Sequence, residues 1–139
     1  MEHTHMNKEQ AYNSFFNRFG VFAFEENAVP TDDVIAQLIN AGSIKSKYPY
    51  ITYQVLLDDL NAPVYPVFSI WDNSTSWERA DLLSNAISEY LQDGIIIRLD
   101  NGRMFITKGS PFAQHQREEG DSNIRRVLCN LGIEFFTKY

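Results

Sequence analysis

The chain has 139 residues, of which 44% are hydrophobic and 22% are charged, as is typical of a single globular domain. Its net charge of −6 argues against a protein whose main task is to bind nucleic-acid phosphates. Its one cysteine, Cys129, excludes an intrachain disulfide and favours a reducing compartment.

The first six residues lack the basic and apolar regions of a signal peptide. We expect residues 1–6 to be a disordered tail or a remnant of cloning, and residues 7–139 to form one α+β domain. His3 and His5 in this tail could bind a metal, but a disordered tail is the preferred interpretation. No apolar run approaches the ~20 residues that span a bilayer, so no membrane partner is expected.

Residues 7–19 carry aromatic side chains at the spacing i, i+3, i+4 and i+7, which predicts an amphipathic helix. These side chains are Tyr12, Phe15, Phe16 and Phe19. We expect them to pack in the core, with a partner-binding face as the alternative.

Residues 31–41 predict a second, short helix, with Thr31 as its N-cap and Gly42 at its end. Four apolar residues are expected to form its buried face: Val34, Ile35, Leu38 and Ile39.

The alternating run of residues 51–57 predicts a strand, and residues 64–71 predict its return partner. Pro66 has no N–H group, so the return strand is expected at an edge of the sheet. Thr75-x-x-Glu78 fits a capping box, which predicts a long helix that runs to about Gln92. Its apolar stripe is Ala80, Leu83, Ala86, Ile87, Tyr90 and Leu91.

Residues 95–107 predict a β-hairpin about a type I′ turn at Asn101-Gly102, because this dipeptide tolerates φ > 0 best. The turn would pair Leu99 with Met104 and Ile97 with Ile106. This apolar face is expected to lie under the long helix.

Residues 108–121 are polar and contain Pro111, so we expect a long exposed loop. Residues 124–139 predict a long last strand, with one buried face formed by Val127, Cys129, Leu131, Ile133 and Phe135. The order of elements indicates an α+β fold, with a mostly antiparallel sheet and helices packed on one face.

No catalytic constellation emerges from the sequence. His115 lies in the predicted loop without a visible partner or pocket, and a solvated loop is preferred over a general base. Cys129 is expected to be a buried structural thiol. We find no nucleophile motif and no glycine-rich phosphate loop, so no catalytic residue, metal or cofactor is expected. Arg125 and Arg126 begin the last strand and could contact a phosphate, pair with acids of a neighbouring subunit or be solvated; the net charge favours the last two.

One sequence of motifs resembles the tail-terminator (tail-completion) proteins of long-tailed bacteriophages. The run Tyr48-Pro49-Tyr50-Ile51-Thr52-Tyr53 opens a strand pair that Trp71 ends, and a capped helix follows. The Asp100-Asn101-Gly102 hairpin, the long loop and a strand from Ile124-Arg125-Arg126 complete the pattern. The resemblance extends from about Phe15 to the end, with the short helix of residues 31–41 as an insertion.

The resemblance implies a virion structural protein of the tail or neck, assembled in the bacterial host cytoplasm. Such proteins form rings, commonly hexameric, that cap the tail tube and join it to the head through connector proteins. DNA would pass through the ring without specific binding. Candidate contacts to subunits or to the tube are Pro111, Phe112, His115, Arg117, Arg125 and Arg126.

Two alternatives remain open. The first is another head–tail connector or tail-associated protein of the same particle. The second, from a different class, is a small ligand-binding domain or enzyme that uses the segment of residues 108–121 and His115.

Overall fold

The computed structural model describes residues 6–57, 62–116, 120 and 123–137. In chain order, its elements are α1 (Lys8–Phe16), β1 (Ala23–Glu25), α2 (Asp32–Ala41), β2 (Tyr50–Tyr53), β3 (Val67–Asn73), α3 (Glu78–Leu91), β4 (Ile95–Leu99), β5 (Gly102–Gln116) and β6 (Ile124–Thr137). The predicted sites at His3, His5 and Arg117 lie outside the described residues.

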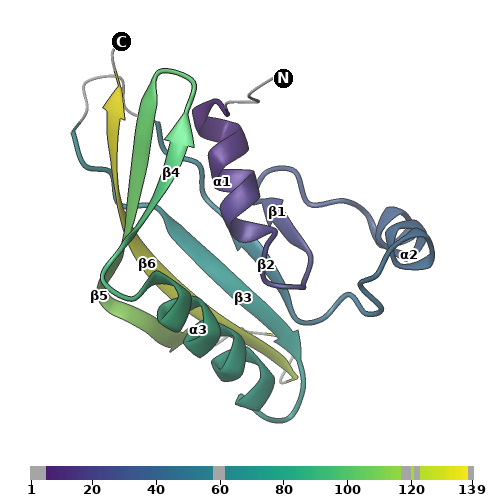
Figure 1. Ribbon diagram of the computed structural model, residues 1–139. Coiled ribbons are helices and arrows are strands. Elements are labelled where there is room, and N and C mark those ends of the chain that lie inside the picture. Colours follow the sequence, from purple (N-terminus) through teal and green to yellow (C-terminus); the bar gives the residue numbers. More distant parts are fainter. Residues whose placement is uncertain (1–5, 58–61, 117–119, 121–122, 138–139) are drawn as a thin grey trace.

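All six strands join one sheet in the order β1-β2-β3-β6-β5-β4. The pairs are antiparallel except β1 with β2, which run parallel and are connected through α2. Figure 1 shows α1 and α3 on the same face of the twisted sheet. The predicted α+β class with a mostly antiparallel sheet is therefore confirmed.

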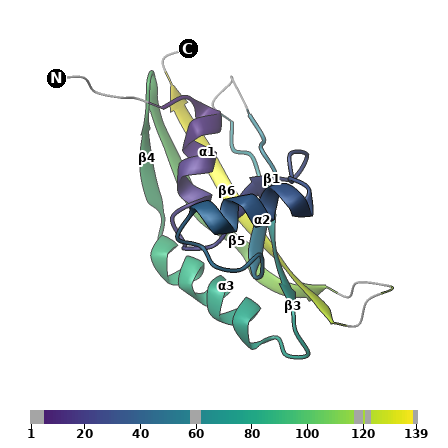
Figure 2. The same ribbon diagram turned by 90° about the vertical axis from the view of Figure 1, so that its right-hand side faces the viewer.

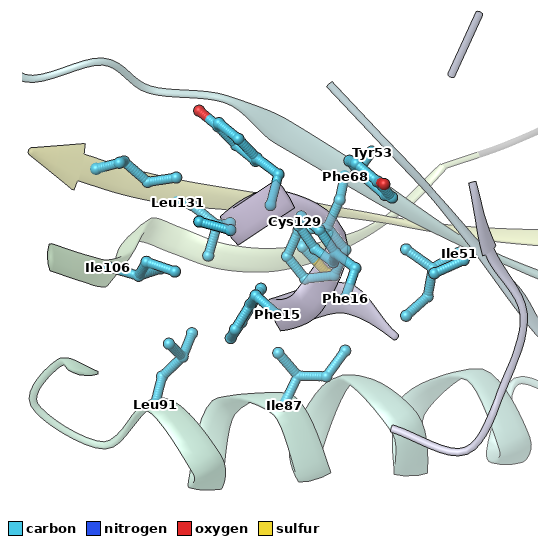
Figure 3. Close-up of a cluster of buried hydrophobic side chains, with 14 of the residues drawn as sticks. Phe15, Phe16, Ile51, Tyr53, Phe68, Ile87, Leu91, Ile106, Cys129 and Leu131 are labelled. Atoms are coloured by element: carbon cyan, nitrogen blue, oxygen red, sulfur yellow. The ribbon is translucent and has the colours of Figure 1, made fainter. Parts of the chain in front are cut away.

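The core lies between this face of the sheet and the two helices. Figure 3 shows Phe15 and Phe16 of α1 between sheet side chains, such as Phe68, and Ile87 and Leu91 of α3. All five side chains are at most 1% exposed. The predicted aromatic stripe of the first helix thus serves the core, where its burial stabilises the fold.

α1 begins with a capping box, in which Asn7 Oδ1 accepts from Gln10 N at 2.8 Å and Gln10 Oε1 accepts from Asn7 N at 3.0 Å. The helix ends at Phe16, earlier than predicted. Phe19 follows the helix and still packs edge-on against Phe15, at a centroid distance of 5.5 Å.

The hairpin of β4 and β5 has the predicted buried face but a different register. Leu99 pairs with Gly102 and Ile97 with Met104, so the connection is Asp100-Asn101 and the pairing is shifted by two residues. Positive φ occurs at Gln92, Gly20, Gly94 and Gly120 among the described residues, so the predicted type I′ turn is wrong. α1 packs on β4, and α3 packs on β5.

Gly102 has a different role from the one the turn motif suggested. A Cβ atom at this position would lie 1.9 Å from the carbonyl oxygen of Phe136 on β6. The glycine is required because two backbones approach closely, and the left-handed conformation is not used.

The segment predicted as a long loop is mainly strand, because β5 continues to Gln116. Its second half pairs with β6, beyond an irregularity in the register between Lys108 and Ala113. The turn-forming residues that suggested a loop lie at this irregularity, which contains Pro111.

Two further predictions about local structure are wrong. β3 lies between β2 and β6 and is not an edge strand, because Pro66 precedes the strand and only its carbonyl is used, as an acceptor from Leu131 N. α3 begins without the Thr75–Glu78 capping box: Glu78 N donates to Ser76 Oγ at 3.1 Å.

α2 stands apart from the sandwich of helices and sheet, beyond the β1 edge (Figures 1 and 2). Thr31 caps it as predicted, with Oγ1 accepting from Val34 N. Its predicted buried face is confirmed in part: Ile35 is buried and Ile39 is half-buried, whereas Val34 and Leu38 are 42% and 41% exposed. We call residues 26–49, which comprise α2 and its two connections, the arm.

Candidate interaction surfaces

The start of α3 brings together two of the predicted site residues. The rings of His115 and Trp77 stack at 3.7 Å with an interplanar angle of 4°. His115 Nε2 lies 2.8 Å from Asp81 Oδ1 on α3. The guanidinium of Arg125 lies 5.5 Å from the Trp77 ring centroid, and its Nη2 donates to the carbonyl of Thr75 at 3.1 Å.

We call Trp77, Asp81, His115 and Arg125 the α3-start cluster. The side-chain planes of Trp77, His115 and Arg125 pack the end of β5 and the start of β6 against the first turn of α3. The histidine has the partner that the sequence did not reveal, because Asp81 is 34 residues away in the chain. His115 and Asp81 are both nearly half exposed, so the contact lies at the surface of the molecule.

A second surface lies on the face of the sheet opposite α1 and α3, which we call the outer face. Trp71 and Arg126 pair across β3 and β6, with the Arg126 guanidinium 4.8 Å from the Trp71 ring centroid. Arg126 Nε also donates to Ser69 Oγ at 3.0 Å. Tyr50 stacks beside Trp71 at 6.4 Å, and Phe24 lies next to Tyr50.

The connection from α2 extends this aromatic row. Lys47 Nζ lies 5.1 Å from the ring centroid of Tyr48 and 5.5 Å from that of Tyr50. Lys47 also donates to Asp32 Oδ1 of α2 at 3.0 Å. This bond raises the pKa of Lys47, and burial raises that of Tyr50. We call Phe24, Lys47, Tyr48, Tyr50, Trp71 and Arg126 the outer-face row.

Pro111 and Phe112 lie away from both groups. Phe112 packs against the core with its ring 6.1 Å from that of Phe68, while Pro111 is exposed and its carbonyl accepts from Asn130 Nδ2 at 2.9 Å. Of the predicted contact residues that the structure describes, His115 and Arg125 therefore share one surface. Arg126 lies on another.

Two buried groups, Asp72 and Cys129, have structural roles. Asp72 is fully buried, and both of its carboxylate oxygens accept from Arg79, at 2.7 and 3.1 Å. Cys129 is fully buried, and burial raises the pKa of its thiol to about 12, which opposes a nucleophilic role. Within the described ranges, no three histidine, cysteine or acidic residues are arranged to hold a metal ion.

The sequence pointed to the arginines but not to their contacts with Trp71 and Trp77. Trp71 and Arg126 are far apart in the chain, and only the pairing of β3 with β6 brings them together. The run of residues 48–53 carried the available signal, because its aromatic side chains alternate between the two faces of β2.

The fold has a counterpart among solved structures. A chain of the "Virion of native gene transfer agent (GTA) particle" superposes with a TM-score of 0.52 and 18% sequence identity. The match covers 81% of the present chain and 77% of that chain, so the likeness in fold extends over most of both. No family profile and no curated protein sequence matches. No helix in the described parts of the chain is long and apolar enough to cross a membrane.

Proposed function

We propose that this chain is a structural protein of a phage or phage-like virion. The observation that carries the proposal is the likeness in fold, over 81% of the chain, to a chain of a gene transfer agent virion. The surface chemistry supports it, since aromatic rings and arginines, as in the outer-face row, are enriched where proteins bind proteins.

Within the particle, we assign the chain the role of tail terminator. The order of motifs described above resembles that family, with strand β5 in place of most of the predicted loop. The role would be structural and not catalytic. Subunits would form a ring, commonly hexameric in such proteins, that caps the tail tube and contacts the connector proteins of the head. The net charge of −6 is compatible with DNA that passes through the ring without being held.

Purified tail tubes that lack a terminator provide the test. The labelled protein should bind one end of each tube and appear as a ring in negative-stain images. Light scattering after size exclusion gives its oligomeric state, both alone and with tubes. A strict monomer that binds no tube would overturn the proposal.

The same assay separates the alternative role of a head–tail connector. A connector would bind purified heads in preference to tube ends. A Trp71→Ser variant tests the outer-face row: loss of binding to tubes or heads would assign the row to that contact. The matched control is Tyr65→Ser, which removes a ring that is 70% exposed and lies outside the row.

A further inference from the structure

The two ends of the sheet carry surfaces of opposite character. β1 forms one end and connects directly to the arm, whereas β4 forms the other. Both surfaces expose apolar side chains, but one carries the carboxylate of Asp33 and the other carries two arginines. Surfaces at opposite ends of one chain can only meet if they belong to different copies.

The arm exposes carboxylates and apolar side chains around α2. Residues 26–49 contain three acidic side chains, Glu26, Asp32 and Asp33, all before or at the start of α2, and two lysines, Lys45 and Lys47, after it. Asp32 is paired with Lys47, whereas Asp33, one residue further along, is exposed and has no ion pair among the described residues. Val34 and Leu38 lie one helical turn apart and are 42% and 41% exposed.

The β4 end presents a groove of about 590 Å³. Arg98 and Arg103 line it from directly opposite positions on β4 and β5, and both are exposed. Ile96 and Phe136, which are 62% and 44% exposed, supply its apolar part. The two arginines outnumber the one carboxylate in the lining, that of Asp100.

The arginine pair is unfavourable in the isolated chain. Like charges that face each other across two strands repel and destabilise the sheet. Arg103 lies 5.6 Å from the Phe136 ring centroid, yet neither guanidinium takes part in an ion pair among the residues described. An acidic partner placed between the two arginines would relieve the repulsion.

We infer that the arm of one copy docks in the β4–β5 groove of the next. Asp33 would face Arg98 and Arg103, and Val34 and Leu38 would cover Ile96 and Phe136. The contact joins two different surfaces, so it repeats head to tail and closes into a ring when the rotation between copies allows. This inference rests on the proposed ring and names the surfaces that form it.

Cross-linking tests the contact directly. Leu38→Cys and Ile96→Cys introduced into one chain should give a ladder of covalent oligomers with a short bis-maleimide, whereas either variant alone should remain monomeric. A mixture of the two single variants should give dimers only. Cys129 is fully buried and serves as the built-in control for non-specific reaction.

Charge reversal provides a second test. Arg98→Glu should weaken self-association at least about tenfold, because Asp33 would then face a like charge. Adding Asp33→Arg to the same chain should restore it. Lys108→Glu is the matched control: it changes the net charge equally, but Lys108 bonds to Ser88 of α3, away from the groove.

The outcomes separate this contact from the proposed function. Binding to tube ends without the cross-linked ladder would overturn the contact and leave the terminator role standing. A ladder without binding to tubes or heads would support the contact and overturn the terminator role. Cross-linking of a single-cysteine variant to itself, or of Leu38→Cys to a tail protein, would overturn the head-to-tail contact.

Discussion

Two regions of the molecule contain helices with apolar stripes. One is the sandwich formed by the sheet with α1 and α3, and the other is the arm, which contains α2. In α1, Tyr12, Phe15 and Phe16 are at most 1% exposed. In α2, only Ile35 is buried, although α2 connects two parallel strands, a position from which helices normally pack on the sheet. The aromatic side chains of α1 are thus stabilised within the chain, whereas α2 leaves most of its apolar stripe at least partly exposed.

The largest loss of stability is expected from Phe16→Ala. The Phe16 ring stacks on Tyr53 at 4.5 Å and contacts Phe15 and Phe68 at 4.9 and 5.0 Å. Truncation leaves a cavity in the core, so the free energy of unfolding should fall by about 4 kcal/mol. Urea unfolding measures this. A loss below about 1 kcal/mol would mean that the contrast between core and arm is overstated.

Arg79→Met should be the next most damaging. It removes the guanidinium that binds both oxygens of the fully buried Asp72 carboxylate. The buried carboxylate would keep the hydrogen bond from Asn73 N but lose its ion pair, which should cost about 3 kcal/mol. Asp72→Asn in the same chain should recover part of the loss, and a purely additive double variant would exclude this explanation.

Most of the architecture follows from patterns that the sequence displays. The alternation of Val127, Cys129 and Leu131 predicted the buried face of β6, and the capping residue Thr31 predicted the start of α2. Both signals lie within a single element, so they could be interpreted without knowing which other element it packs against.

The errors arise where long-range pairing overrides a local signal. Pro111 and its polar neighbours suggest a loop. The hydrogen bonds to β6 nevertheless keep β5 in the strand conformation on both sides of Pro111. The apolar stripe of α2 is indistinguishable in sequence from one that faces a core. For the candidate surfaces, the sequence was enough to identify the arginines. The contacts of Trp77 with His115 and of Trp71 with Arg126 became visible only in the folded structure.

Substitutions at Gly102 and Asn101 test whether the pairing with β6, and not the local turn signal, determines the conformation here. Gly102→Ala should lower the free energy of unfolding by about 2 kcal/mol, because the new methyl group would collide with the backbone of Phe136. Asn101→Ala should change it by less than about 0.5 kcal/mol, since Asn101 does not need positive φ. If both variants lowered the free energy of unfolding equally, the result would support the type I′ turn and contradict the observed register.

Leu38 combines a small expected loss of stability with the sharpest test of the comparison. Leu38→Ser removes an apolar side chain that is 41% exposed, so the free energy of unfolding should fall by only about 1 kcal/mol. Self-association should nevertheless weaken at least about tenfold, because the part of the side chain that is exposed in the monomer would be buried between copies. Ile35→Ser, on the same helix but at a buried position, should instead cost about 2 kcal/mol within the monomer. If Leu38→Ser destabilised the monomer as much as Ile35→Ser, the arm would be part of the chain's own core, and the difference between the two regions would disappear.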